Sequence, residues 1–96
     1  MTHNLKIHPE YFLEVLTGNK PFEVRKNDRN FKIGDTLILQ EYCPNEKEFT
    51  GDLCARKVSY ILKGENLGIE KGYVVLGLQN ELLNKPWVPD FISDSE

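Results

Sequence analysis

Turn-forming residues recur along this chain at intervals of roughly ten, and this spacing constrains the fold more than any other feature of the sequence. The segments between the turns alternate apolar and polar residues, as half-buried strands do. We expect strands at about 4–7, 20–26, 36–42, 53–64 and 73–80, with a polar loop over 43–52. About five strands and one early helix predict a β-rich α+β fold, a small antiparallel or mixed barrel, rather than a sheet of βαβ units.

The early helix is predicted by the segment HPEYFLEVLTG. Pro9 stands where a first helical residue belongs, and Gly18 is placed to end the helix in a left-handed conformation. Apolar residues recur between them at the spacing of one helix face: Phe12, Val15 and Leu16. In the longest expected strand, the same reasoning with a period of two places Val58, Tyr60 and Leu62 on one face.

With 96 residues, the chain has the length of one domain. We assign residues 1–83 to that domain and 84–96 to an acidic tail containing two prolines, in which Trp87 and Phe91 are expected to cover an apolar edge or, alternatively, to dock a partner. No apolar run approaches the ~20 residues that span a bilayer, and no apolar signal-peptide core is visible. We therefore expect a cytoplasmic protein that contacts no membrane and is by default a monomer.

The few cysteines and histidines do not predict a metal site or a cofactor. Cys43 and Cys54 lack the spacing of a zinc site, and in a reducing compartment we expect them to be free thiols rather than a disulfide. His3 and His8 are expected to be surface or capping residues, because too few further metal ligands accompany them.

A cluster of positive charge follows the predicted helix. Within 20–32, five basic residues stand against two acidic ones, a local charge of +3 in a chain whose net charge is −3. Such polarisation indicates an anionic partner. We predict that the following residues contact RNA or a nucleotide: Lys20, Glu23, Arg25, Lys26, Arg29 and Lys32.

Two glycines are expected to shape the region around this cluster. Gly18 permits a tight reversal that launches Lys20 at the mouth of the next strand, and Gly34 opens the turn into the strand after it. In the first of these strands Glu23 and Arg25 share one face. The carboxylate can orient the guanidinium and leave donors free for a phosphate or a base edge.

The pattern G-x-K-x-x-E-x-R, here Gly18, Lys20, Glu23 and Arg25, resembles the signature of ASCH domains, which are relatives of the PUA RNA-binding barrel. Further stretches, including LKIHPEYFLEVLTG, VSYIL and GYVVL, resemble a bacterial and phage branch known as DUF3850, over about residues 5–78. The resemblance implies a small PUA-like β-barrel with the helix beside a cleft, signature residues lining that cleft, and RNA binding.

Two other functions remain as alternatives. Some small ASCH proteins are amidohydrolases that act on acetylcytidine with a lysine, a threonine and a later glutamate. Lys20 matches that lysine but Glu23 replaces the threonine, so these two residues are the only catalytic candidates and we favour a protein that is not an enzyme. A protein-interaction module is the other alternative. If the strand binds no ligand, its Lys, Glu and Arg side chains would simply form ion pairs in solvent.

Three aromatic residues near the cluster are candidates for stacking on a base, with core packing the favoured alternative for each: Tyr11, Phe31 and Tyr42. The acidic remainder of the chain disfavours extended binding to a duplex, which needs a long basic stripe.

Overall fold

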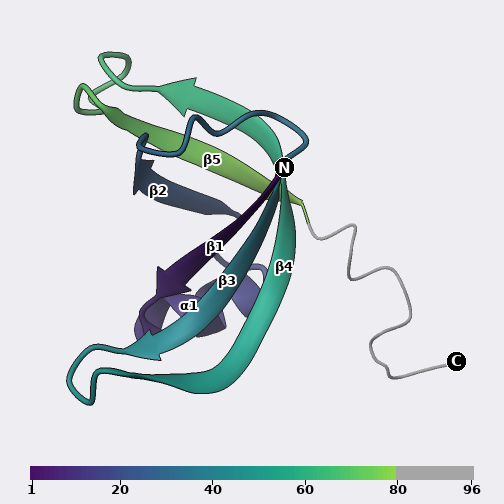
Figure 1. Ribbon diagram of the computed structural model, residues 1–96. Coiled ribbons are helices and arrows are strands. Elements are labelled where there is room, and N and C mark those ends of the chain that lie inside the picture. Colours follow the sequence, from purple (N-terminus) through teal and green to yellow (C-terminus); the bar gives the residue numbers. More distant parts are fainter. Residues whose placement is uncertain (80–96) are drawn as a thin grey trace, which may run out of the picture.

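The computed structural model describes residues 1–79, in which five strands form one strongly curled sheet, a half barrel, with one short helix (Figure 1). The elements are β1 (Thr2–Ile7), α1 (Pro9–Leu16), β2 (Phe22–Lys26), β3 (Thr36–Cys43), β4 (Glu48–Lys63) and β5 (Tyr73–Gln79). The expectation of a β-rich fold with about five strands and one early helix is confirmed. The predicted domain boundary at 83 and the roles of Trp87 and Phe91 lie outside the described residues.

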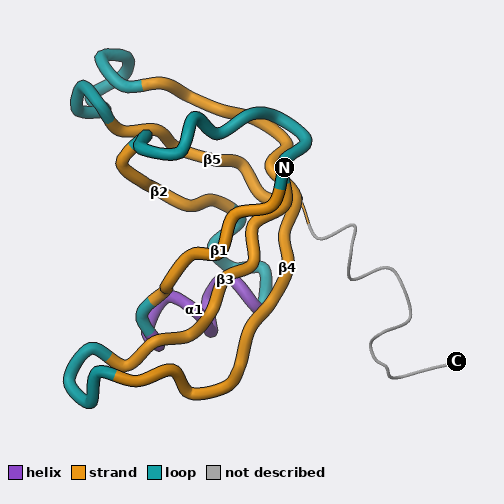
Figure 2. Tube along the Cα trace, viewed as in Figure 1, coloured by secondary structure: helices purple, strands orange, loops and turns teal. Residues whose placement is uncertain are grey.

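The strand order is β1-β3-β4-β5-β2, which leaves β1 and β2 as the two edges of the sheet. The β1–β3 pair is parallel and the other three pairs are antiparallel, so the sheet is mixed. Because β4 is 16 residues long, its first part pairs with β3 and its second part with β5. β4 thus runs through both halves of the sheet and curls it (Figure 2).

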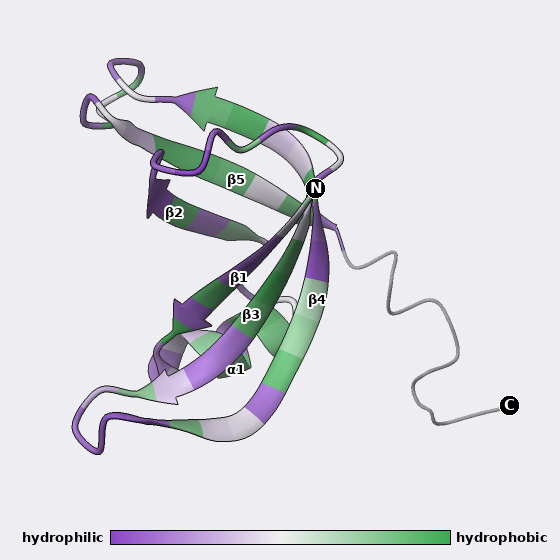
Figure 3. Cartoon of the chain, viewed as in Figure 1, coloured by the Kyte–Doolittle hydropathy of each residue, from purple (hydrophilic) through white to green (hydrophobic). Residues whose placement is uncertain are grey.

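The core lies inside the curl and is closed by α1. In β3 an apolar stretch at 37–39 is followed by polar residues, and in β4 apolar and polar stretches follow one another (Figure 3). Leu37, Leu39 and Leu76 are fully buried there, and Phe12 and Val15 of α1 join the same apolar cluster. The helix face predicted from the sequence is therefore correct for these two residues, whereas Leu16 is 45% exposed.

The structure corrects two details of β4. The strand begins at Glu48, within the predicted loop, because Phe49 pairs with Tyr42 and their rings meet edge to face with centroids 5.0 Å apart. A register shift between Val58 and Tyr60 places Val58 in the core and leaves Tyr60 62% exposed. The prediction that these two residues share a face is wrong, because a β-bulge reverses the alternation.

Asp35, after Gly34, ties the start of β3 to its neighbours. Gly34 adopts φ +97°, as the predicted turn requires. The buried Asp35 carboxylate accepts hydrogen bonds from His3 Nε2 at 2.8 Å, from the Lys32 backbone N–H at 3.0 Å and from the Met1 amino group at 3.3 Å. His3 is only 6% exposed, so the expectation of a surface or capping residue is wrong for it.

We expect Asp35→Asn to lower the free energy of unfolding by about 1–2 kcal/mol near neutral pH. Burial alone raises the pKa of Asp35, but the bonds from His3, Lys32 and Met1 outweigh burial and leave the pKa below its ordinary value. The native state thus gains stability from the ionised form above a pH of about 4, and loses it as the pH falls through the lowered pKa. Urea unfolding at about pH 7 and pH 3 should show the difference between the two proteins shrinking in acid. Asp52→Asn, at an exposed position, is the control, and a difference independent of pH would contradict the assignment.

Candidate ligand-binding cleft

The corner between α1 and β2 is built as the sequence predicts. Gly18 follows the helix with φ +87°, and its N–H donates to the Val15 carbonyl at 3.1 Å. The Lys20 N–H donates to the Glu14 carbonyl at 2.9 Å, which closes the last turn of the helix. The direction in which Lys20 leaves the helix is therefore set by the backbone.

The charged face of β2 points into the protein. Glu23 is 6% exposed, whereas Phe22 and Val24 on the other face are 41% and 49% exposed. Lys20 Nζ lies 3.0 Å from Glu23 Oε1, and Arg25 Nε lies 2.8 Å from Glu23 Oε2. The predicted pairing of Glu23 with Arg25 is confirmed, and burial of the carboxylate excludes a merely solvated charged strand.

Two arginines bridge the gap between the edge strands. Arg25 Nη2 donates to the Lys6 carbonyl. Arg29 Nη1 donates to the Asn4 carbonyl at 3.1 Å, and both carbonyls belong to β1. The first bond connects β1 to β2, and the second connects β1 to the loop that follows β2. The two strands are the edges of the sheet and do not pair with each other. Nε and Nη2 of Arg25 are used by these bonds, whereas Nη1 has no acceptor within residues 1–79. Nη1 is therefore the part of the predicted fork that remains available to a ligand.

We call the hollow beside this bridge the motif cleft. It has a volume of about 260 Å³, and a second hollow of about 340 Å³, lined by Lys20, shares Tyr11, Glu23 and Val24 with it. The cleft thus lies between the end of β1, the start of α1 and β2. It is lined by Lys6, Ile7, His8, Tyr11, Glu23, Val24, Arg25 and Lys26.

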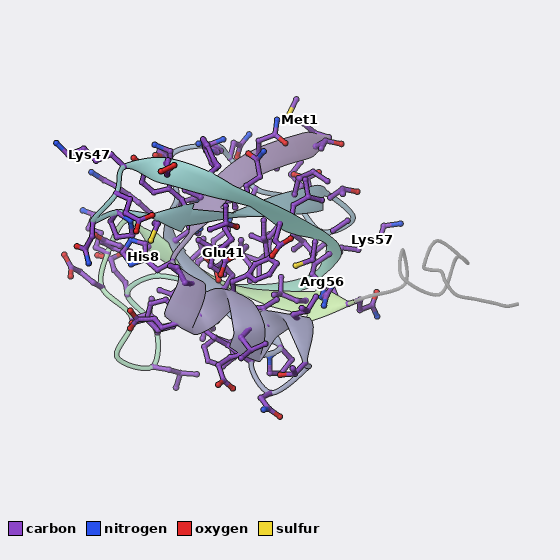
Figure 4. All side chains as sticks on the ribbon, turned by 90° about the horizontal axis from the view of Figure 1, so that it is seen from below. Met1, His8, Glu41, Lys47, Arg56 and Lys57 are labelled. Carbon is purple, nitrogen blue, oxygen red and sulfur yellow. The ribbon has the colours of Figure 1, made fainter. Side chains whose placement is uncertain are left out.

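The motif cleft combines positive charge with an accessible aromatic ring. The cleft and the adjoining hollow are lined by four cationic side chains and one carboxylate, that of Glu23: the cations are Lys6, Lys20, Arg25 and Lys26. Tyr11 is 47% exposed, and its ring lies nearly parallel to that of His8, with an interplanar angle of 16° and centroids 6.4 Å apart. His8 stands at the start of α1 (Figure 4). Lys20 Nζ lies 5.6 Å from the Tyr11 ring centroid, which links the ring to the charged group.

Some predicted contact residues lie away from the motif cleft. Arg29 and Lys32 are exposed in the loop after β2 and do not line the cleft. Phe31 is 7% exposed and packs edge-on against His3, so it is a core residue and cannot stack on a ligand. Tyr42 lies near the end of β3, in the hairpin that β3 forms with β4, and Lys6 Nζ is 4.2 Å from its ring centroid.

The thiols are free, as predicted. Cys54 is buried and Cys43 half-buried, and their strand partners are Leu39 and Glu48 respectively. Burial raises the pKa of the Cys54 thiol, with Arg56 lowering it and Glu23 raising it further, so Cys54 stays protonated at neutral pH. Among residues 1–79 no group of three His, Cys, Asp or Glu side chains could hold a metal ion, and no helix there is long and apolar enough to cross a membrane.

Arg56 lines a separate pocket, which it shares with Lys20, and we did not predict a role for it. It is 4% exposed on β4, and its Nη2 donates to the carbonyls of Val15 and Leu16 at the end of α1. The signal in the sequence is its spacing, because a period of two places Arg56 on the buried face with Cys54 and Val58. Figure 4 shows Arg56 near the end of β5.

Comparison with known sequences identifies relatives without a described activity. A protein-family profile, described as "Domain of unknown function (DUF3850)", matches residues 2–78. The chain is also 51% identical over 49 residues to an uncharacterized 12.9 kDa protein in the GpA 3' region of Escherichia phage P2. That similarity covers 51% of this chain and 43% of the phage protein.

Proposed function

Because this chain belongs to the DUF3850 family, whose function is unknown, we propose a function from its motif cleft: the protein binds single-stranded RNA or a nucleotide there. One observation carries the proposal. The buried Glu23 carboxylate holds Lys20 and Arg25 at opposite oxygens, in a cleft that also presents the ring of Tyr11. A fixed pair of cations beside an exposed ring suits a phosphate and an unstacked base.

The size of the cleft favours a small footprint. A volume of about 260 Å³ is near the lower limit of small-molecule sites, as expected for one base with its sugar. Residues 1–79 contain eleven basic and eleven acidic residues, so the domain carries no long basic stripe for a duplex. Recognition of one or two nucleotides of a single strand is the reading that this charge distribution supports.

The fold supports placing the domain with PUA-like, ASCH-type barrels. A curled five-stranded sheet with a helix beside the cleft has the coarse form that those barrels share. Of the G-x-K-x-x-E-x-R residues, Glu23 and Arg25 line the cleft and Lys20 lines the adjoining hollow. The placement is our proposal, and it favours RNA over a partner protein as the ligand.

The test is fluorescence anisotropy with labelled single-stranded RNA of about ten nucleotides in about 50 mM salt. We expect Tyr11→Ala to weaken binding about 5- to 30-fold through lost stacking, and Arg25→Lys about 10-fold because lysine lacks the planar fork. Tyr60→Ala removes a tyrosine that is 62% exposed and lies outside the cleft, and this variant should bind as the wild type does. One or two neutralised phosphates, as a footprint of one or two nucleotides allows, would make the slope of log affinity against log salt roughly −0.7 to −1.4.

The absence of binding to RNA and to mononucleotides in low salt would contradict the proposal. The same would follow if Tyr11→Ala and Tyr60→Ala bound RNA equally well, since the cleft would then not be the site. A much steeper salt slope would place further phosphate contacts outside the cleft.

Hydrolysis of a modified nucleoside is the second candidate, favoured by one contact. Lys20 Nζ lies 3.0 Å from a buried carboxylate, which is the geometry of a proton-transfer pair. Incubation with acetylcytidine should release acetate if this candidate is correct, and Lys20→Ala should abolish the release while the nucleoside still binds. Release of acetate by the wild type and not by Lys20→Ala would make the protein a hydrolase.

A further inference from the structure

Arg56 carries a buried charge that no carboxylate compensates within residues 1–79. Its side chain is one of the most buried polar groups of the domain, and it takes part in none of the ion pairs formed by the described residues. A buried cation without a counter-charge is costly, so its presence requires an explanation.

Backbone carbonyls satisfy only part of this guanidinium. Nη1 donates to the Ala55 carbonyl at 2.8 Å, and Nη2 donates to the carbonyls of Val15 at 3.2 Å and Leu16 at 3.5 Å. Nε and the second N–H of Nη1 have no acceptor among the residues that the structure describes. The end of a helix offers a partial negative charge, which offsets about half of a unit charge.

The same guanidinium lines a pocket that shares Lys20 with the hollow beside the motif cleft. This pocket, which we call the Arg56 pocket, has a volume of about 280 Å³ and lies where α1 and β5 both end. Lys20 borders it and adds a second positive charge. The remaining lining residues are mostly apolar or small: Val15, Gly18, Pro21, Leu78 and Gln79.

We propose that the Arg56 pocket binds a carboxylate carried on a small apolar group. The carboxylate supplies the missing counter-charge and accepts the unused guanidinium N–H groups, while Val15, Pro21 and Leu78 receive the apolar part. A monoanion fits better than a phosphate dianion, because the Val15 and Leu16 carbonyls at the same guanidinium repel additional negative charge.

The carboxylate has two possible sources, a free acid or this chain itself. Gln79 lines the pocket, and Glu81 follows two residues later in the sequence. Both sources share the same chemistry at Arg56, and replacement of Glu81 separates them.

The experiment is a titration of the ¹⁵N-labelled 96-residue chain with sodium butyrate, followed by NMR at the Arg56 Nε–H and the backbone amides of Gly18 and Leu78. We expect saturable shifts at all three positions with butyrate and none with the neutral control, n-butanol. Arg56→Lys, which retains the charge, should weaken butyrate binding at least about fivefold. The direct observation of Arg56 in the wild type keeps the test valid if that variant unfolds.

Two further variants locate the site and the source. Tyr11 does not line the Arg56 pocket, so Tyr11→Ala should leave butyrate binding unchanged. The two sites are thus tested independently, and a failure of RNA binding would not count against the Arg56 pocket. Glu81→Gln should bind butyrate more tightly if the chain supplies its own carboxylate, and as the wild type does if the ligand is a free acid. Absence of a saturable shift in both the wild type and Glu81→Gln would overturn the proposal. Tighter binding of inorganic phosphate than of butyrate would overturn the assignment to a monoanion.

Discussion

Replacement of Arg25 by alanine is expected to lower the free energy of unfolding by about 2–3 kcal/mol. Glu23 is 6% exposed and, among residues 1–79, would keep Lys20 as its one ionic partner. Loss of a partner from a buried ion pair is destabilising. The variant also loses the hydrogen bond from Arg25 to the Lys6 carbonyl. Of the two arginine bonds to β1 described above, the one from Arg29, in the loop after β2, to the Asn4 carbonyl would then remain.

Urea unfolding measures the loss, and Lys26→Ala is the matched control. Lys26 is the next residue of β2, lines the same cleft and is exposed, so its removal should change stability by no more than about 0.5 kcal/mol. Hydrogen exchange should show faster exchange of β1 and β2 amides in Arg25→Ala than in Lys26→Ala. Equal stability of the two variants would show that Arg25 does not connect the edges of the half barrel.

The helix and the corner after it could be predicted because their signals are local. Pro9 and Gly18 mark the ends of α1, and each acts through the conformation of its own backbone. The pairing of Glu23 with Arg25 was predictable for the same reason, since residues two apart in a strand share a face.

The direction of that face was not predictable from alternation alone. A period of two separates Phe22 and Val24 from Glu23 and Arg25 but does not say which pair points inward. Hydropathy favours burial of the apolar pair, and the structure buries Glu23 instead because Lys20 and Arg25 neutralise it. A strand whose charged face is buried is therefore itself a sign of a site rather than of stability.

Long-range contacts account for the other differences. His3 is buried because Asp35, 32 residues later, accepts its hydrogen bond, and no local pattern contains that contact. Arg56 reaches carbonyls about 40 residues earlier in the sequence. The bulge between Val58 and Tyr60 arises from the pairing of β4 with β5, so the residues of β4 alone do not predict it.

The second large effect is expected at Leu76, which connects the core to the motif cleft. Leu76 is fully buried on β5 and pairs with Glu23 across the β2–β5 ladder. Directly opposed residues of an antiparallel pair share a face, so Leu76 lies beside Glu23 on the inner side of the sheet. Its side chain excludes water from the carboxylate and strengthens the attraction of Glu23 for its two cations.

Leu76→Ala should therefore lower the free energy of unfolding by about 3–4 kcal/mol, through lost burial and the cavity left in the half barrel. Leu67→Ala makes the same chemical change at a side chain that is 87% exposed, and it should cost less than about 0.5 kcal/mol. Urea unfolding of both variants measures how much of the lost free energy of unfolding comes from the buried position, because the chemical change is the same in both. Because water then reaches Glu23, ligand binding should weaken in Leu76→Ala even under conditions where the protein remains folded. A variant that is destabilised but binds as tightly as the wild type would show that the core and the cleft are energetically independent.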